Sequence, residues 1–326
     1  MARQYRIVRK ITTVPITAGQ FSLFDLPRSY DYESLFLRIN ASLQVTVAAT
    51  SVRAEAPVQL VPRIEVITEG KNTIYSAPFW FASFGNYGRP ITEAGARATT
   101  PPSAVGVATY AVEAIGIADF MTPDGRRPKD TNLRTRSFSL FQCRLTYGQP
   151  GDPFVGGTVV FSGAPTVDVF SAELVEETDD KGNFIGAPAA LKKISYVQAA
   201  IPASNNNFQQ RLPAGNLIRS VLLRGEGSVT AGEPATNVFN NIILQSGTDV
   251  RLNLAAANLR AKNNADYGQI TAGYYVADLL SKGLHPVDLT ELWDVTRQAE
   301  PLAVLDITGG ANVVFQAVVT EFIFPG

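Results

Sequence analysis

The sequence predicts an all-β protein built of two tandem eight-stranded jelly rolls, with short helices in the connecting loops. The first observation is an internal sequence repeat. Residues 34–38 (SLFLR) resemble residues 220–224 (SVLLR), and a Leu-Pro pair precedes each run, so that both features recur 186 residues apart. The second is a series of strand-sized segments bounded by Gly, Pro, Asn and Asp, without the strand–helix rhythm of a parallel sheet. The third is the length of 326 residues, which suits two β domains better than one.

Strands in the first half are predicted from polar–apolar alternation and from β-branched or aromatic residues. The clearest alternation runs through 37–47. Pro62 interrupts another candidate and is typical of a strand edge or a bulge. The predicted strands are 6–14, 35–47, 59–68, 73–75, 105–120, 158–161 and 167–175.

The second half repeats this order with shorter connections. Gly70, in a predicted turn, is matched by Gly247 at an offset of 177, and residues 169–172 (VFSA) are matched by 314–317 (VFQA) at an offset of 145. Residues 254–262 carry strong helix formers and predict a helix, and their first-half counterpart, 77–85, is either a helical turn or an aromatic loop. The predicted strands are 238–245, 250–254, 302–307 and 313–324.

These assignments predict four segments. Residues 1–20 are an N-terminal arm, and residues 21–177 form the first jelly roll, with a long loop over 89–136. Residues 178–207 hold a linker and the first strand of the second half. Residues 208–326 form the second jelly roll. The long loop is rich in turn residues, and an excursion present in only one copy is typical of a surface loop.

Composition argues against several function classes. The net charge is −1, which predicts no sequence-wide binding of nucleic acid. With one cysteine, Cys143, and one histidine, His285, the chain offers no disulfide framework and no His/Cys metal cluster. No phosphate-binding glycine loop or nucleophile elbow occurs, so we expect no catalytic, cofactor-binding or metal-binding residues and no cofactor.

The start of the chain is locally basic, because Arg3, Arg6, Arg9 and Lys10 precede any acidic residue. Two interpretations stay open. The segment is either a β-strand with a solvated basic face or an arm that contacts phosphate or an anionic lipid surface.

Aromatic residues are concentrated at 79–87, where Phe79, Trp80, Phe81, Phe84 and Tyr87 lie close together. Such a platform could stack a sugar or a base. The alternative, which we favour, is that these side chains fill a seam between domains or between subunits.

The duplicated architecture, with the run LPAGNLIRS at 212–220 and Asp266-Tyr267-Gly268, resembles the double jelly-roll major capsid proteins. These belong to tectiviruses, corticoviruses, adenovirus (the hexon) and related bacteriophages with an internal membrane. The resemblance covers essentially the whole chain.

The resemblance implies that three chains form a trimer whose six jelly rolls make a pseudo-hexameric capsomer of an icosahedral shell in the virion, after synthesis in the host cytoplasm. It implies an outward tower or trimer clasp at 89–136 and an inward-facing arm at the N-terminus. Implied partners are further copies of the chain, minor capsid, penton or membrane proteins, and internal membrane lipid. Family members often start with a helix, whereas residues 5–14 look strand-like.

Two other functions are compatible with the sequence. A receptor- or carbohydrate-binding β-sandwich, such as a phage spike or a lectin-like protein, would use the aromatic run. A glycan-active enzyme would use paired carboxylates such as Glu176 and Glu177, but nothing in the sequence places them across a cleft.

Overall fold

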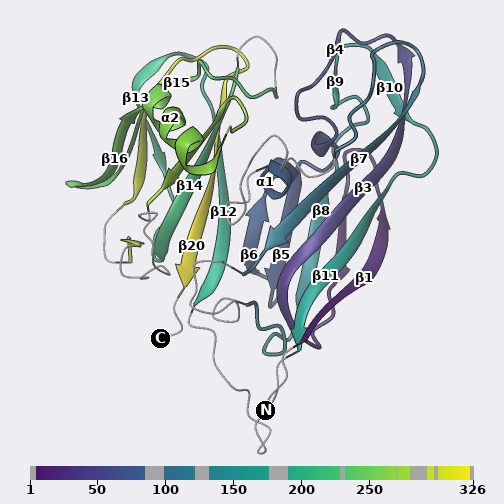
Figure 1. Ribbon diagram of the computed structural model, residues 1–326, viewed down its shortest axis with the longest axis horizontal. Helices are drawn as coiled ribbons and strands as arrows, with labels where there is room; N and C mark the ends of the chain where they lie inside the picture. The colour runs from purple at the N-terminus through teal and green to yellow at the C-terminus, as the bar shows by residue number, and fades with distance from the viewer. Residues whose placement is uncertain are drawn as a thin grey trace, which may run out of the picture. The chain divides into compact units, whose positions relative to one another are not determined.

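The protein is described from a computed structural model, which divides into two compact units (Figure 1). The first unit comprises Met1–Gly88, Ala96–Lys192 and Phe324–Gly326, and the second comprises Arg89–Gly95 and Lys193–Ile323. The structure describes residues 5–84, 99–121, 132–175, 190–227, 232–268, 270–279, 292–296 and 300–323.

The first unit is a sandwich of two antiparallel sheets. One sheet has the order β1-β11-β3-β7, and the other has the order β6-β5-β8-β2. A strand pair, β4–β9, and the short strand β10, which also pairs with β3, complete the unit. The bounds are β1 Tyr5–Pro15, β2 Phe21–Asp25, β3 Asp31–Val47, β4 Ser51–Val52, η1 Val58–Leu60, β5 Arg63–Thr68, β6 Asn72–Ala77, α1 Phe79–Phe84, β7 Thr109–Asp119, β8 Phe141–Thr146, β9 Phe154–Val155, β10 Thr158–Phe161 and β11 Thr166–Val175.

The second unit repeats this design. Its sheets have the orders β12-β20-β14-β17 and β13-β19-β15-β16, and β18 adds a short pairing to β14. The bounds are β12 Leu191–Ala200, β13 Asn205–Arg211, β14 Leu217–Glu226, β15 Phe239–Ser246, β16 Asp249–Ala255, α2 Ala256–Tyr267, β17 Tyr274–Asp278, β18 Trp293–Asp294, β19 Leu302–Ile307 and β20 Val314–Ile323.

The two units have the same topology. Numbering the eight main strands of each unit in chain order gives sheets 1-8-3-6 and 2-7-4-5 in both, which is the jelly roll. Each unit carries its helix between the fifth and sixth main strands: α1 precedes β7 and α2 precedes β17. The prediction of two eight-stranded jelly rolls with short helices in the connections is therefore confirmed.

Strand pairing confirms that the repeated runs 34–38 and 220–224 occupy equivalent positions in the two units. Ser34 lies opposite Asp119 in the first unit, and Ser220 lies opposite Asp278 in the second. The sequence match between 169–172 of β11 and 314–317 of β20 pairs equivalent strands, but in the wrong register. Leu37 faces Val169 while Leu223 faces Ala317, so the true offset is 148 rather than 145.

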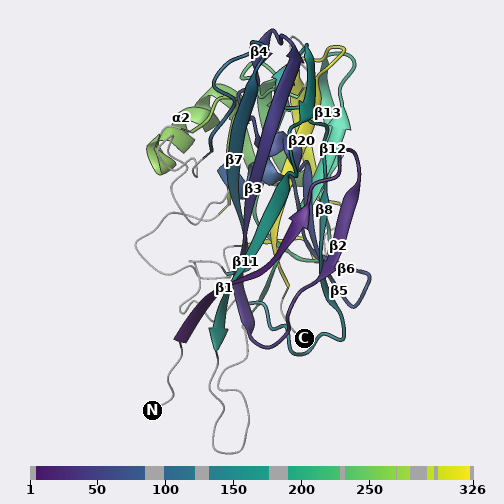
Figure 2. The ribbon, with the colours of Figure 1, turned by 90° about the vertical axis from the view of Figure 1, so that its right-hand side faces the viewer.

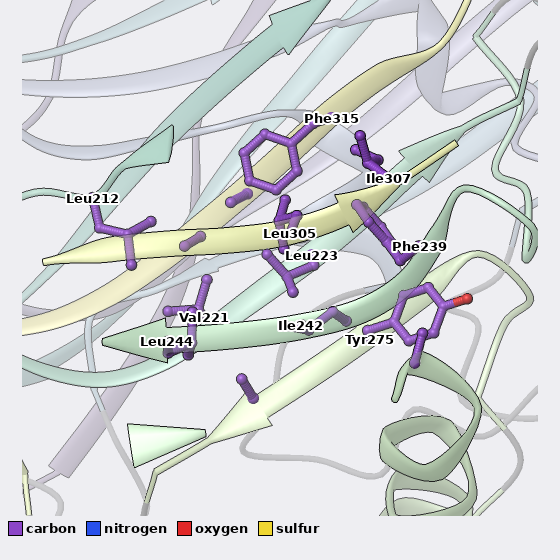
Figure 3. Packing of buried hydrophobic residues seen from close by; sticks show 14 of the residues in the cluster. Leu212, Val221, Leu223, Phe239, Ile242, Leu244, Tyr275, Leu305, Ile307 and Phe315 are labelled. Atoms are coloured by element: carbon purple, nitrogen blue, oxygen red, sulfur yellow. The ribbon is translucent and has the colours of Figure 1, made fainter. Parts of the chain in front are cut away.

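The alternation that predicted β3 follows from its position over the core. Leu35, Leu37 and Ile39 are fully buried, whereas the residues between them face the outer side of the sheet. The second unit has its own core, in which Val221 and Leu223 of β14 lie among residues of β15, β19 and β20 (Figure 3). Phe239 packs edge-to-face on Tyr275 with the ring centres 5.4 Å apart.

Turn glycines also match between the units. Gly70 joins β5 to β6 and Gly247 joins β15 to β16, with positive φ angles of 69° and 58°. A residue with a Cβ atom is strained in this left-handed region, so glycine is the expected residue at both turns.

Two segment predictions need correction. Residues 5–15 of the predicted N-terminal arm are not an arm, because they form β1 and pair with β11 from Tyr5–Val175 to Pro15–Thr166. The predicted loop at 89–136 contains β7, a main strand of the first jelly roll. Residues 89–98 and 122–131 of this region, and 178–189 of the predicted linker, lie outside the described residues.

Candidate assembly surfaces

Three of the four predicted basic residues lie on β1, and each pairs with an acid of the same unit. Arg6 pairs with Glu33, and Lys10 Nζ lies 2.7 Å from Asp168 Oδ1. Arg9 donates two hydrogen bonds, of 3.1 and 3.0 Å, to the carboxylate of Glu173. The three positive charges are therefore neutralised by acidic residues on other strands of the same sheet, and contact of the segment with an anionic lipid surface stays a prediction. Arg3 lies outside the described residues.

The Arg9–Glu173 pair fixes β1 to the sheet. The Glu173 side chain is fully buried and also accepts a hydrogen bond from Ser171 Oγ. Burial, together with the nearby Glu173 charge, raises the pKa of Tyr32 well above its usual range. The Arg9 guanidinium also lies 5.7 Å from the ring centre of Tyr30, close enough for a cation–π contact. Sequence reasoning missed this role, because Glu173 is 164 residues away from Arg9 along the chain.

The predicted aromatic platform is not at the surface. Phe79, Trp80 and Phe81 lie on α1 and are 0%, 6% and 4% exposed. A Cβ atom added to Gly116 of β7 would lie 2.9 Å from the ring of Phe79, which shows how tightly the helix packs on that strand. The side chain of Phe84 and residue Tyr87 lie outside the described residues.

This burial bears on the two interpretations of the aromatic run. The three side chains offer no accessible face for stacking a sugar or a base, and their place in a seam between domains or between subunits stays a prediction. An accessible edge or face is needed for that kind of stacking.

The described residues show little that could perform chemistry. Cys143 is buried in β8, and burial raises the pKa of its thiol far above the usual range, so it is not an activated nucleophile. No cluster of three or more His, Cys, Asp and Glu residues is placed to hold a metal ion in the described ranges. Within the same ranges, no helix is both long enough and apolar enough to cross a membrane. His285 lies outside them.

The sheet β1-β11-β3-β7 of the first unit has an outer side, onto which Figure 2 looks. Phe170, Phe36 and Ile117 lie directly opposite one another on three adjacent strands and are partly exposed. Phe36 and Phe170 pack edge-to-face with their ring centres 5.5 Å apart. The surface therefore carries an apolar row across its middle.

Charged groups on this surface are paired beside the apolar row. Arg38 donates two 2.8 Å hydrogen bonds to Glu113, and Lys10 pairs with Asp168, which Thr13 Oγ1 also approaches to 2.7 Å. Hydrogen bonds from Lys10 and Thr13 lower the pKa of Asp168, and the bonds from Arg38 lower that of Glu113. A shallow hollow of about 410 Å³ lies next to Glu113, lined also by Asn40, Ser42 and Thr166 among other residues.

Comparison with known proteins identifies the fold. No protein-family model matches the chain, and no curated protein sequence matches it. Its structure is that of the double jelly roll, as found in viral major capsid proteins. These capsid proteins are less than 25% identical to the chain, so the shared feature is the fold.

Three solved structures illustrate the likeness. The crystal structure of the STIV MCP has a TM-score of 0.71 at 14% identity and covers 98% of this chain and 97% of that one. An atomic structure of Sulfolobus Turreted Icosahedral Virus gives 0.69 at 15% identity, covering 98% and 91%. The major capsid protein P2 from bacteriophage PM2 gives 0.61 at 11% identity, covering 99% and 98%.

Proposed function

We propose that this chain is the major capsid protein of a virus and that it acts in the virion as a structural subunit rather than as an enzyme. One observation carries the proposal. Two jelly rolls with the same strand order follow one another in one chain, and this whole arrangement matches major capsid proteins over 98–99% of its length. The likeness therefore extends to the duplication itself and is not confined to one β-sandwich.

The duplication supports a specific form of assembly. Three chains, each with two similar units, would supply six similar building blocks and make a pseudo-hexameric capsomer that tiles an icosahedral shell. Closed rings of identical contacts are the usual route to stable homo-oligomers. The charged fraction of 17% suits a chain that covers much of its surface in large permanent interfaces.

Further partners follow as part of the same proposal. The shell would surround an internal membrane and would carry minor capsid and penton proteins at its special positions. The connections around β7, from residue 89 to 136, would contribute an outward tower or a clasp between subunits.

The carbohydrate-binding alternative loses its main support in the structure. It depended on an accessible aromatic run, whereas Trp80 is 6% exposed. Lectin-like binding would need another aromatic surface, and the partly exposed Phe36 and Phe170 lie among paired charges on a sheet.

Electron microscopy of the purified chain tests the proposal. The expected particles are trimers with a six-lobed outline that assemble into flat arrays or shells as protein concentration rises. Particles that stay monomeric under all assembly conditions would contradict the proposal.

A further inference from the structure

The strand β2 forms an open edge of the first unit. It is the last strand of the sheet β6-β5-β8-β2, and among the described residues it pairs with β8 alone. Tyr147 N donates a 2.8 Å hydrogen bond to Gln20 O, which fixes the direction of the backbone groups at the start of the strand. Each residue of an antiparallel strand directs its N–H and C=O to the same side, and the side alternates along the chain. The backbone groups of Phe21, Leu23 and Asp25 therefore point away from β8.

This edge is apolar and regular. Phe21 and Leu23 are 54% and 49% exposed, and the ladder between β2 and β8 runs without a register shift. Natural proteins usually protect an exposed edge strand with charges, proline or a bulge, because its free backbone groups pair readily with another strand. The strand β2 has no proline, no bulge and a charge only at its last residue, Asp25. It is therefore a ready template for a further strand.

Two other edge strands of the chain are protected. The strand β1 carries Arg6, Arg9 and Lys10 and has a register shift after Lys10. The strand β13 holds the position of β2 in the second unit, and it has the polar sequence NNNFQQR and a register shift in its first half. The apolar, regular edge is thus a particular property of β2, and it is not imposed by the jelly roll.

The Phe21 end of this edge is positively charged. The guanidinium of Arg144, on β8, lies 4.4 Å from the ring centre of Phe21. Arg144 and Arg63 share the carboxylate of Glu65, at N–O distances of 3.7 and 3.3 Å. Their side chains are 41% and 42% exposed, so a partner can reach them. Two guanidinium groups against one carboxylate leave a positive charge in excess beside Phe21.

The opposite end of the strand is negatively charged. Asp25 is exposed and lies on the same side of the sheet as Phe21, because alternate side chains of a strand face one side. Its Oδ1 accepts a 2.9 Å hydrogen bond from the uncharged Gln142. A second copy of β2 that runs antiparallel to the first reverses this order of charges. It would bring the partner's Asp25 beside Phe21, close to Arg144, and the partner's Leu23 beside Leu23.

We propose that β2 pairs edge to edge with β2 of a second copy of this chain, about a twofold axis at Leu23. In this register Leu23 lies opposite the partner's Leu23, and Phe21 lies opposite the partner's Asp25. The contact between Arg144 and Asp25 occurs twice, once on each side of the axis. A twofold contact requires one surface that complements itself, and the charges and apolar residues of β2 meet this requirement.

This inference goes beyond the proposed function. A trimer closes through threefold contacts, whereas the β2 pairing has twofold symmetry and would join one trimer to the next. The strand is five residues long, so the contact is small. Small interfaces are weak as isolated pairs and gain strength where several act together. The test must therefore detect a weak contact directly.

Disulfide cross-linking provides such a test. Leu23→Cys places two sulfur atoms at the axis, where facing residues of a hydrogen-bonded pair have Cα atoms about 5.5 Å apart, a separation that a disulfide spans. Phe21→Cys is the matched control, because it lies on the same strand with similar exposure but does not face its own copy. The natural Cys143 is buried. Each purified chain is oxidised mildly, and linked dimers are measured on a non-reducing gel.

We expect Leu23→Cys to form linked dimers about tenfold faster than Phe21→Cys, because pairing raises the effective concentration of the two thiols. A mixture of Phe21→Cys and Asp25→Cys chains should give the mixed dimer, since these positions face each other. Adding Arg144→Glu to the Leu23→Cys chain should slow its cross-linking, because like charges then face each other. Adding Asp25→Arg as well should restore the rate.

The outcomes decide between the register and its absence. Equal rates for Leu23→Cys and Phe21→Cys would overturn the proposal, since the cross-links would then come from random collisions. If Leu23→Cys leaves Cys143 reactive to a thiol reagent, the mixture of Phe21→Cys and Asp25→Cys decides in its place, and a missing mixed dimer overturns the pairing. Trimers that form without this cross-link overturn the pairing and leave the capsid function intact.

Discussion

The attachment of β1 to its sheet depends on one buried ion pair, and its removal has a calculable effect. Glu173 is fully buried, and Arg9, whose side chain is 39% exposed, supplies two of its hydrogen bonds. Removing one partner of a fully buried pair costs about 3–5 kcal/mol. Because water reaches the exposed part of Arg9, we expect Arg9→Ala to lower the free energy of unfolding by about 2 kcal/mol.

A neighbouring arginine provides the control. Arg6 lies on the same strand as Arg9, is 53% exposed and pairs with Glu33 of β3, so Arg6→Ala is expected to cost only about 0–1 kcal/mol. For a unit of this size, each kcal/mol lowers the melting temperature by about 2–4 °C. Thermal unfolding followed by circular dichroism should therefore show a loss of about 4–8 °C for Arg9→Ala and clearly less for Arg6→Ala.

A double-mutant cycle separates the pair from other effects of the substitution. With Glu173→Gln already present, the buried charge is gone, and Arg9→Ala should cost about 1 kcal/mol less than it does in the natural sequence. Equal losses for Arg9→Ala and Arg6→Ala, or a cycle with no coupling, would refute the reasoning.

Three further predictions follow from the first unit. Gly116→Ala places a methyl group 2.9 Å from the Phe79 ring and should lower the free energy of unfolding by about 1–3 kcal/mol, measured as a lower denaturant midpoint. An unchanged midpoint would show that α1 shifts away from β7 without loss of stability. Cys143 should react with a thiol reagent only as fast as the unit unfolds, and rapid labelling at neutral pH would contradict its burial. The pKa of Asp168 is lowered, first by its hydrogen bond to Lys10, so the ionised carboxylate stabilises the fold above the ordinary pKa of 3.8, and this stability is lost as the pH falls below that value. The free energy of unfolding of Asp168→Asn should therefore depend less on pH in that range than that of the natural sequence, and identical pH profiles would argue against the bond.

Much of the fold could be predicted from local sequence. The runs at 34–38 and 220–224 keep the same pattern because both β3 and β14 lie over a core on one side, with Leu35 and Val221 at equivalent buried positions. The glycine turns at 70 and 247 were recognisable because the left-handed backbone leaves little choice of residue. The short match between 169–172 and 314–317 found the correct strands, but four residues are too few to fix register.

The surface roles were not accessible from the sequence. The basic start of the chain looked free because its acidic partners lie far away, with Glu33 27 residues from Arg6 and Glu173 164 residues from Arg9. The apolar row of Phe170, Phe36 and Ile117 joins one residue from each of three strands, and none of them forms a local motif. Phe79 and Trp80 gave a strong local signal, but composition alone does not show whether an aromatic cluster is covered.

The central claim, that this chain is a capsid subunit, is tested most directly by the mass of the purified protein in solution. Light scattering on a sizing column should give a single species near 105 kDa, three times the chain mass of 35.1 kDa, that persists on dilution. A stable monomer of 35.1 kDa at all concentrations would contradict the account.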